Sequence, residues 1–176
     1  MKKIAIAILL STFVSPPAIA DLYTGIKLGR VTYGYDQATS YSRVGYGLLY
    51  GNTITKNFSV EGEYNNLGGY ASATDNVAGT AYSLSAIGFY PHKPPYSFFG
   101  KMGVFSSTLT VTTKPGSGPK GSYTINNRGF MVGLGAQAEI SKEIGIRGGI
   151  DIYPAWGGVP KTSALQSIYI CTVLKF

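Results

Sequence analysis

Apolar residues recur at every second position over long stretches of this chain. In residues 144–153 the apolar face is Ile144, Ile146, Gly148, Ile150 and Ile152. A period of two places alternate side chains on opposite faces of a β-strand. Residues 130–140 alternate in the same way, and only three residues, 141–143, separate the two stretches. This short link predicts a β-hairpin.

The same alternation predicts eight strands. They cover residues 22–35, 41–52, 57–67, 79–90, 96–112, 122–140, 144–155 and 164–176. The alternation is ambiguous between residues 105 and 112, which allows for a β-bulge there. The predicted fold class is therefore all-β, an eight-stranded antiparallel up-and-down β-barrel.

The predicted connections alternate in length along the chain. Short links at 53–56, 91–95 and 141–143 fall at one end of the barrel, and polar, glycine-rich segments at 36–40, 68–78, 113–121 and 156–163 fall at the other. Barrels of bacterial outer membranes have short periplasmic turns and longer extracellular loops. The long segments are therefore expected to be surface loops.

The face opposite the apolar one decides whether the sequence predicts a water-soluble barrel or a membrane barrel. Charged residues make up 13% of the chain, against about 25% in an ordinary soluble domain, which is too few to cover a water-facing wall. One face of the strands is almost entirely apolar and suits contact with lipid. The opposite face carries glycine and opposed charges, which suit a narrow barrel interior. The charged residues assigned to the interior are Lys27, Glu61, Glu63, Lys101, Arg147 and Asp151. The barrel is therefore predicted to be transmembrane.

Residues 1–20 have the pattern of a secretory signal peptide. Lys2 and Lys3 precede an apolar run at 4–14, and residues 18–20 read Ala-Ile-Ala, a typical cleavage site. An anchoring helix is the less favoured alternative, because the run is shorter than the roughly 20 residues that a membrane-spanning helix needs. We expect cleavage before Asp21, a barrel domain at 21–176, and export to a Gram-negative outer membrane.

The mature chain is mildly basic. Loss of the two leader lysines lowers the count of Lys and Arg from 15 to 13 against 8 Asp and Glu, a net charge of +5. No basic cluster or helix suggests nucleic acid, so the expected partners are outer-membrane lipid, lipopolysaccharide and a host or cell-surface ligand at the loops. The candidate glycolipid contacts are Arg30, Arg43, Lys114, Lys120, Arg128 and Lys161. The alternative is that these charges only keep the surface soluble.

Candidate catalytic chemistry is sparse in this sequence. The chain has one cysteine, Cys171, and one histidine, His92, so no metal site, cofactor or histidine-based catalysis is expected. His92 falls in a predicted periplasmic turn, away from outer-leaflet lipid. Cys171 alternates inward with Tyr169 and Val173 and is expected to be a small packing residue. We therefore expect that the protein is not an enzyme.

Three segments resemble the OmpA-type small outer-membrane barrels. They are the mature start DLYTGIKLG, the hairpin EISKEIGIRGG and the terminal VLKF. The resemblance implies interior ion pairs among Lys27, Glu61, Lys101 and Arg147. Where that family places a carboxylate facing Arg147, this chain has Gln137, so Glu61, Glu63, Glu139 and Asp151 remain alternative partners. The cell-wall tethering of the family's longer members is not expected here.

The same resemblance implies an assembly signal at the end of the chain. Its residues are Ile170, Leu174 and Phe176, and its expected partner is the barrel-assembly machinery. The function expected from the whole sequence is a non-enzymatic barrel with a structural and surface-interaction role, adhesin-like and contacting glycolipid or host through its loops. The alternative is a narrow ion-conducting pore gated by the interior ion pairs, because paired charges in a lumen either neutralise one another or gate a water path.

Overall fold

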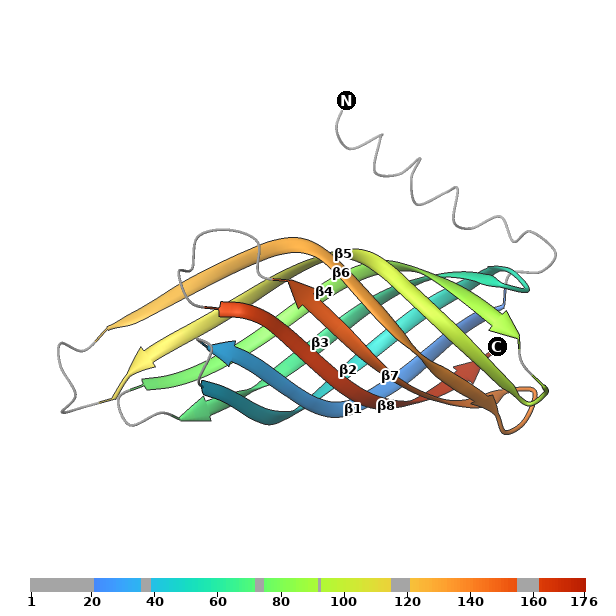
Figure 1. Cartoon of the computed structure of the whole chain (residues 1–176), viewed down its shortest axis with the longest axis horizontal. Coiled ribbons are helices and arrows are strands. Elements are labelled where there is room, and N and C mark those ends of the chain that lie inside the picture. Colours follow the sequence, from blue (N-terminus) through green and yellow to red (C-terminus); the bar gives the residue numbers. More distant parts are fainter. Residues whose placement is uncertain (1–20, 36–38, 72–74, 92, 115–120, 155–161) are drawn as a thin grey trace, which may run out of the picture.

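The computed structural model describes residues 21–35, 39–71, 75–91, 93–114, 121–154 and 162–176. These residues form eight strands: β1 (Leu22–Tyr35), β2 (Thr39–Thr55), β3 (Phe58–Ala71), β4 (Asp75–Pro91), β5 (Tyr96–Thr113), β6 (Ser122–Glu139), β7 (Ile144–Pro154) and β8 (Thr162–Lys175). Each strand pairs with the next, and β8 pairs with β1 to close the barrel (Figure 1). The predicted eight-stranded antiparallel up-and-down barrel is confirmed. No helix in the described residues is long and apolar enough to cross a membrane.

The barrel closes where its first and last strands meet. Lys27 of β1 lies opposite Cys171 of β8, and this antiparallel register runs from Tyr23 to Tyr35 with one irregularity near the loop end. At the chain end, the amide N–H of Phe176 donates to the carbonyl oxygen of Leu22 (N–O 2.9 Å). Closure leaves no unpaired strand edge around the middle of the barrel, where a lipid-facing edge would be costly.

Strands β3 and β4 extend farther than the sequence predicts. The prediction ended β3 at residue 67 and began β4 at residue 79, whereas the ladder continues to the pair Ala71 and Asn76. Glycine, serine and asparagine in this stretch suggested a loop, because these residues favour turns. The segment pairs instead as an extension of the hairpin, with Gly68 in a left-handed conformation (φ 71°) where the register shifts.

The structure places no bulge at residues 105–112. The pairing of β5 with β4 and with β6 is continuous through this segment, and the register shifts lie at Tyr33–Tyr35, Thr53–Thr55 and Asn66–Gly69. The sequence does not show which side chains of this segment face inward, because the polarity of both faces of the strand changes here. No residue is inserted. Outward positions become serine and threonine, while inward positions such as Val111 remain apolar.

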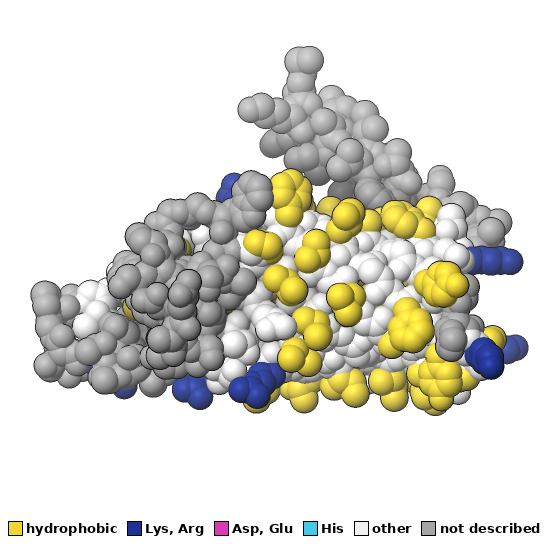
Figure 2. All heavy atoms as spheres, in the orientation of Figure 1, with side chains coloured by type: hydrophobic (Ala, Val, Ile, Leu, Met, Phe, Trp, Pro, Cys, Tyr) yellow, Lys and Arg dark blue, Asp and Glu magenta, His cyan; other side chains and the backbone are white. Residues whose placement is uncertain are grey.

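The outer wall of the barrel is apolar. Figure 2 shows hydrophobic side chains across the visible wall, with Lys and Arg at its two margins. The exposed apolar residues, each between 41% and 69% exposed, include Ile26, Leu28, Leu48, Leu84, Met102, Val104, Leu134, Ile146 and Ile170. The opposite face of the same strands is buried in the lumen, as the alternation predicts.

Interior glycines make room for the large side chains in the lumen. A Cβ atom added at Gly135 would lie 2.7 Å from Cε1 of Phe99, and one added at Gly149 would lie 2.9 Å from the Tyr169 hydroxyl. These contacts are too short for any real Cβ. The glycine-rich inner face therefore allows aromatic rings to fill a barrel whose interior is only wide enough for side chains.

One side of the barrel is taller than the other. The β4–β5 ladder continues to Asp75 and Thr113, and the β5–β6 ladder to Thr112 and Ser122. The β6–β7 ladder stops at the pair Val132 and Ile152. Figure 1 accordingly shows β4, β5 and β6 reaching past the end of β7 on the side away from the C-terminus.

Candidate functional site

Four charged side chains from the odd-numbered strands form an alternating ring inside the barrel. Lys27 Nζ (β1) lies 3.0 Å from Glu63 Oε2 (β3) and 2.5 Å from Asp151 Oδ2 (β7). Lys101 Nζ (β5) completes the ring through an ion pair with Glu63 and a contact of 3.2 Å with Asp151 Oδ2. Because these strands are spaced evenly around the barrel, the ring crosses the whole lumen. All four residues are at most 5% exposed.

Arg147 and Glu61 form a second layer beside this ring. Arg147 Nη1 (β7) donates to Glu61 Oε2 (β3) at 2.6 Å, and Lys101 Nζ lies 3.7 Å from Glu61 Oε1, which links the layers. Among the partners that the sequence left open for Arg147, the geometry selects Glu61. Gln137, which replaces the expected carboxylate, accepts a hydrogen bond from Arg147 Nε at 3.0 Å.

The two layers are neutral as a unit. The cluster contains three cations, Lys27, Lys101 and Arg147, and three carboxylates, Glu61, Glu63 and Asp151. An unpaired charge among such buried side chains would cost several kcal/mol. Mutual neutralisation is therefore what allows six ionised side chains to fill the lumen, and the structure brings together all six residues that the sequence assigned to the interior.

Aromatic rings complete the surroundings of the cations. Lys27 Nζ lies 3.8 Å from the centroid of the Tyr169 ring. The guanidinium carbon of Arg147 lies 5.5, 5.6 and 5.2 Å from the ring centroids of Tyr23, Phe89 and Phe99. Ring faces attract cations most strongly where water is excluded. The sequence placed Tyr23 and Tyr169 on the inward face, but it did not predict their contacts with the cations or the inward positions of Phe89 and Phe99.

Asn65 is another residue of the network that the sequence analysis missed. Its side-chain amide donates to Glu63 Oε2 at 3.1 Å. The signal was available, because Asn65 follows Glu63 by two positions and therefore lies on the same face of β3. Its contact fills an acceptor position of Glu63 that faces the loop end of the lumen.

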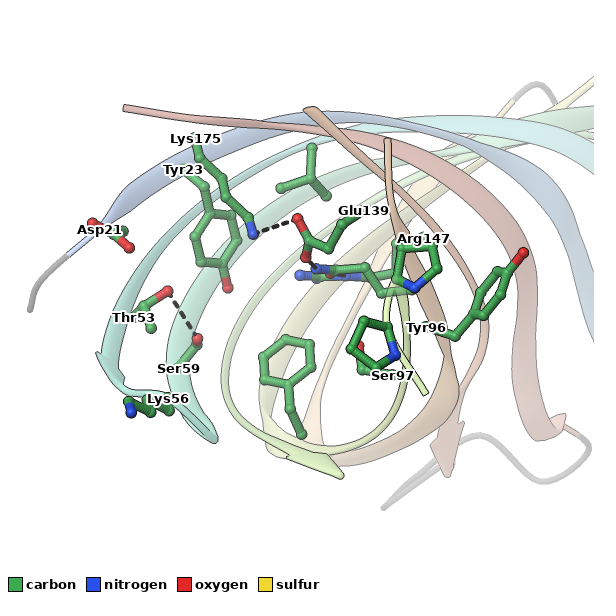
Figure 3. A pocket seen from close by; sticks show the side chains of 15 residues that line it. Asp21, Tyr23, Thr53, Lys56, Ser59, Tyr96, Ser97, Glu139, Arg147 and Lys175 are labelled. Atoms are coloured by element: carbon green, nitrogen blue, oxygen red, sulfur yellow. Dashed lines mark hydrogen bonds and ion pairs between the residues drawn. The ribbon is translucent and has the colours of Figure 1, made fainter. Parts of the chain in front are cut away.

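A cavity of about 390 Å³ opens at the end of the barrel where the chain terminates (Figure 3). Arg147, Gln137 and Tyr23 are among the residues that line it. Near them, Lys175 Nζ pairs with Glu139 Oε2 at 2.6 Å, and Gln137 Nε2 donates to Glu139 Oε1 at 2.6 Å. A chain of polar contacts therefore runs from the buried guanidinium toward this mouth.

On the other side of the ring the space is much smaller. A cavity of about 10 Å³ is lined by Lys27, Asn65, Tyr153 and Ser167 together with their neighbours. This volume is at the lower limit for holding one water molecule. The 390 Å³ cavity therefore extends inward as far as Arg147 and the aromatic ring of Phe89.

Groups suited to catalysis are few in the described residues. No set of three His, Cys, Asp or Glu side chains there is placed to hold a metal ion. Cys171 is 1% exposed and packs in a cluster with Tyr169 and Val173, in the inward orientation that the alternation predicts. His92 lies outside the described residues.

The candidate glycolipid contacts lie in different environments. Arg30 and Arg128 are exposed on the outer wall, whereas Arg43 pairs with inward-facing Val31 and so lies on the inner face at the rim. Lys114 follows β5 and is partly buried. Lys120 and Lys161 lie outside the described residues, as does Trp156.

The residues proposed as an assembly signal lie in one outward-facing row. Ile170 is 58% exposed, Leu174 is 42% exposed and Phe176 is 78% exposed. Ile170 and Leu174 belong to β8, and Phe176 follows its last residue. A partner approaching from the lipid side would meet all three side chains.

Comparison with known proteins places this barrel among outer-membrane proteins. Residues 4–166 match the family described as the outer membrane protein beta-barrel domain. The chain belongs to this family. Its membership confirms the predicted outer-membrane location and the resemblance to small outer-membrane barrels. No curated protein matches the sequence significantly.

Solved structures of small outer-membrane barrels share the fold at low sequence identity. Neisserial surface protein A is 11% identical, with a TM-score of 0.74 over 88% of this chain and 97% of that one. The attachment invasion locus protein Ail of Yersinia pestis is 14% identical, with a TM-score of 0.62 over 89% and 97%. OprG of Pseudomonas aeruginosa is 13% identical, with a TM-score of 0.62 over 88% and 95%.

Proposed function

We propose that this protein is a closed, non-enzymatic outer-membrane barrel that acts as a surface-interaction protein through an extracellular sheet. The sheet consists of the paired ends of β4, β5 and β6 that extend beyond the end of β7, residues 75–81, 107–113 and 122–127. The observation that carries the proposal is the β6 edge of this sheet, which no strand among the described residues pairs.

The extracellular sheet has the polarity of a water-exposed element. On β5 the outward residues change from Met102 and Val104 to Ser106, Thr108 and Thr110. On the inner face, Leu109 packs against a buried cluster that includes Val31 and Leu67. A polar outside and an apolar inside are typical of an antiparallel sheet in water, so this part of the barrel is expected to stand above the lipid.

One edge of the extracellular sheet carries unpaired main-chain groups. The β6–β7 ladder covers Val132 to Glu139 of β6, and no strand of the described chain pairs with the same edge of residues 122–131. Exposed edges recruit extended peptides as an added strand. The partner favoured by this geometry is an extended segment of a surface or host protein.

The buried charge network favours a scaffold over the alternative of a pore. Ion conduction needs a hydrated path, whereas these charges neutralise one another across the lumen: Lys27 lies 2.5–3.0 Å from Glu63 and Asp151, and Lys101 pairs with Glu63 and lies 3.2 Å from Asp151. Breaking such pairs in a dry interior is costly. The pairs therefore act as structural contacts that hold the four odd strands at fixed positions.

Two related structures suggest which ligands to try. Ail is named as an attachment invasion locus protein, and one of its structures contains the heparin analogue sucrose octasulfate. This chain shares the fold with Ail at 14% identity, and its mature part is basic. Sulfated glycan is therefore a second probe beside extended peptide.

The proposal is tested by attachment of bacterial cells that display the barrel on their surface. Thr124→Lys with Asn126→Lys adds two charges to the free edge. Thr108→Lys with Thr110→Lys is the matched control, because these residues lie directly opposite on the central strand β5. Both double variants also remove the contact of 3.0 Å between Thr108 and Asn126.

Attachment to host cells or matrix is expected to fall severalfold in the edge variant and to persist in the control variant. Displayed protein is quantified on the same cells. Attachment no greater than that of cells lacking the barrel contradicts the proposed function. An equal loss in both double variants points to charge alone and contradicts the role of the edge.

A further inference from the structure

A shallow groove of about 660 Å³ lies on the outer wall across β4, β5 and β6. Its lining includes two cross-strand rows of outward side chains. The upper row is Tyr82, Ser106 and Arg128, and the lower row is Leu84, Val104 and Phe130. The small Ser106 separates two large side chains, so the upper row has a gap at its centre.

The two rows differ in chemistry. The upper row presents a phenol, a hydroxyl and a guanidinium, all able to donate hydrogen bonds. The lower row is apolar and well exposed, with Leu84 at 57%, Val104 at 48% and Phe130 at 61%. An amphiphile bound in this groove would therefore have hydrogen-bond donors near its head group and apolar side chains along its acyl chain.

The groove lies at the margin of the apolar wall, on the loop side. On β5, the next outward residue below the groove is Met102, and those above it are Thr108 and Thr110. This change of polarity marks the interface between lipid and water. The donors of the upper row therefore lie at the level of lipid head groups in the outer leaflet.

One wall of the groove is held in place. The Tyr82 ring packs against Tyr64 of β3, with centroids 5.2 Å apart and planes inclined at 50°. Arg128 forms no ion pair with any described residue, and its guanidinium fork matches the oxygens of a phosphate group. The charge on the rim is therefore complementary to an anionic head group.

We infer that this groove binds one phosphorylated glycolipid of the outer leaflet, of the lipopolysaccharide type. The Arg128 guanidinium and the Tyr82 hydroxyl contact a phosphate, and an acyl chain lies along Leu84, Val104 and Phe130. Arg128 and Phe130 lie on the stretch of β6 that β7 does not pair, but the groove is formed by their outward side chains and does not depend on strand addition at the main-chain edge. It also assigns different roles to two arginines that the sequence alone treated as equivalent.

Arg30 offers a matched control for Arg128. Both arginines are exposed on the outer wall at the loop end. Arg30 lies between the bulky outward side chains Val44 and Ile168, whereas Arg128 lies beside Ser106. Only Arg128 lines the groove.

The test uses the folded full barrel in vesicles of phosphatidylethanolamine that contain lipopolysaccharide. The barrel is extracted, and the lipopolysaccharide retained per barrel is measured for Arg128→Ala, for Ser106→Leu, which fills the groove, and for Arg30→Ala. A gel of unboiled and boiled samples verifies folding. We expect about a tenfold weaker apparent affinity for the first two variants, equivalent to about 1.4 kcal/mol, and less than a twofold change for Arg30→Ala.

Three results would overturn the inference. Unchanged lipopolysaccharide retention in Arg128→Ala would show that Arg128 does not contact the head group. A similar loss of retention in Arg30→Ala would show that the effect comes from positive charge in general. Normal lipopolysaccharide retention in Ser106→Leu would show that the lipid does not bind in the groove. Dephosphorylated lipopolysaccharide, or phosphatidylglycerol in place of lipopolysaccharide, is expected to be retained weakly; equal retention of either one contradicts the assigned ligand.

Discussion

Arg147 and Glu61 belong to opposite walls of the barrel, and their side chains meet in the lumen at 2.6 Å. Arg147 is 1% exposed and Glu61 is 0% exposed. The pair joins β7 to β3, which are not neighbours in the sheet. It therefore links the barrel across its interior, where main-chain ladders cannot.

Arg147→Ala is expected to destabilise the barrel by about 3–5 kcal/mol, because it leaves the buried Glu61 carboxylate without its main partner. Urea unfolding in lipid vesicles measures the loss. Lys175→Ala is the control, since it breaks the pair with Glu139, whose side chains are about one-third exposed, and should cost under about 1 kcal/mol. Equal losses would contradict the structural role of the buried pair.

Arg147→Met with Glu61→Gln should recover part of the stability lost in Arg147→Ala, because neither buried position then carries a charge. A double-mutant cycle in the same unfolding assay measures the coupling. Strict additivity of the two single changes would show that the contact of 2.6 Å contributes nothing to folding.

Gly135→Ala is expected to destabilise the barrel by about 1–3 kcal/mol, because the added methyl group overlaps the Phe99 ring. Gly100→Ala is the matched control on β5. Its added Cβ meets nothing within 4 Å, so its effect should stay within about 0.5 kcal/mol. Similar melting of both variants in detergent would show that the lumen is less tightly packed than the contacts indicate.

The interior residues were predictable from the sequence because a period of two needs no knowledge of the partner strands. The period of two placed Lys27 and Arg147 on one face, and the glycine and opposed charges of that face assigned it to the interior. The pairing of Arg147 with Glu61 was not predictable, because it depends on the stagger of β3 and β7 around the closed barrel. Gln137, by contrast, lies opposite Arg147 in the β6–β7 register, as the resemblance implied.

The extracellular sheet shows a second limit of the sequence pattern. Apolar alternation identifies strands whose outer face contacts lipid. It fails beyond Ser106, where the outer face becomes polar while apolar residues pack on the inner face. Thr108 and Thr110 therefore looked like an irregular segment, although the ladder continues through them. Phe89 and Phe99 in the lumen escaped notice for a related reason, since aromatic residues favour strands on either face.

Phe176→Ala is expected to reduce the amount of barrel assembled in cells while leaving refolding in vitro nearly unchanged. We propose that the 78% exposed Phe176 ring contacts the assembly machinery, whereas its main-chain hydrogen bond to Leu22 remains in the variant. Phe58→Ala, at an exposed aromatic position on β3, serves as the control. Heat-modifiable protein in outer-membrane fractions is the readout, and equal yields for both variants would contradict the signal.

The central claim is that the paired charges close the lumen. Single-channel recording of the folded mature chain in a planar bilayer tests it most directly, with a gel of unboiled and boiled samples to verify folding. The account predicts no sustained conductance steps from folded barrels. Stable, charge-selective steps that change in Lys27→Ala would contradict it and identify the cluster as a gate.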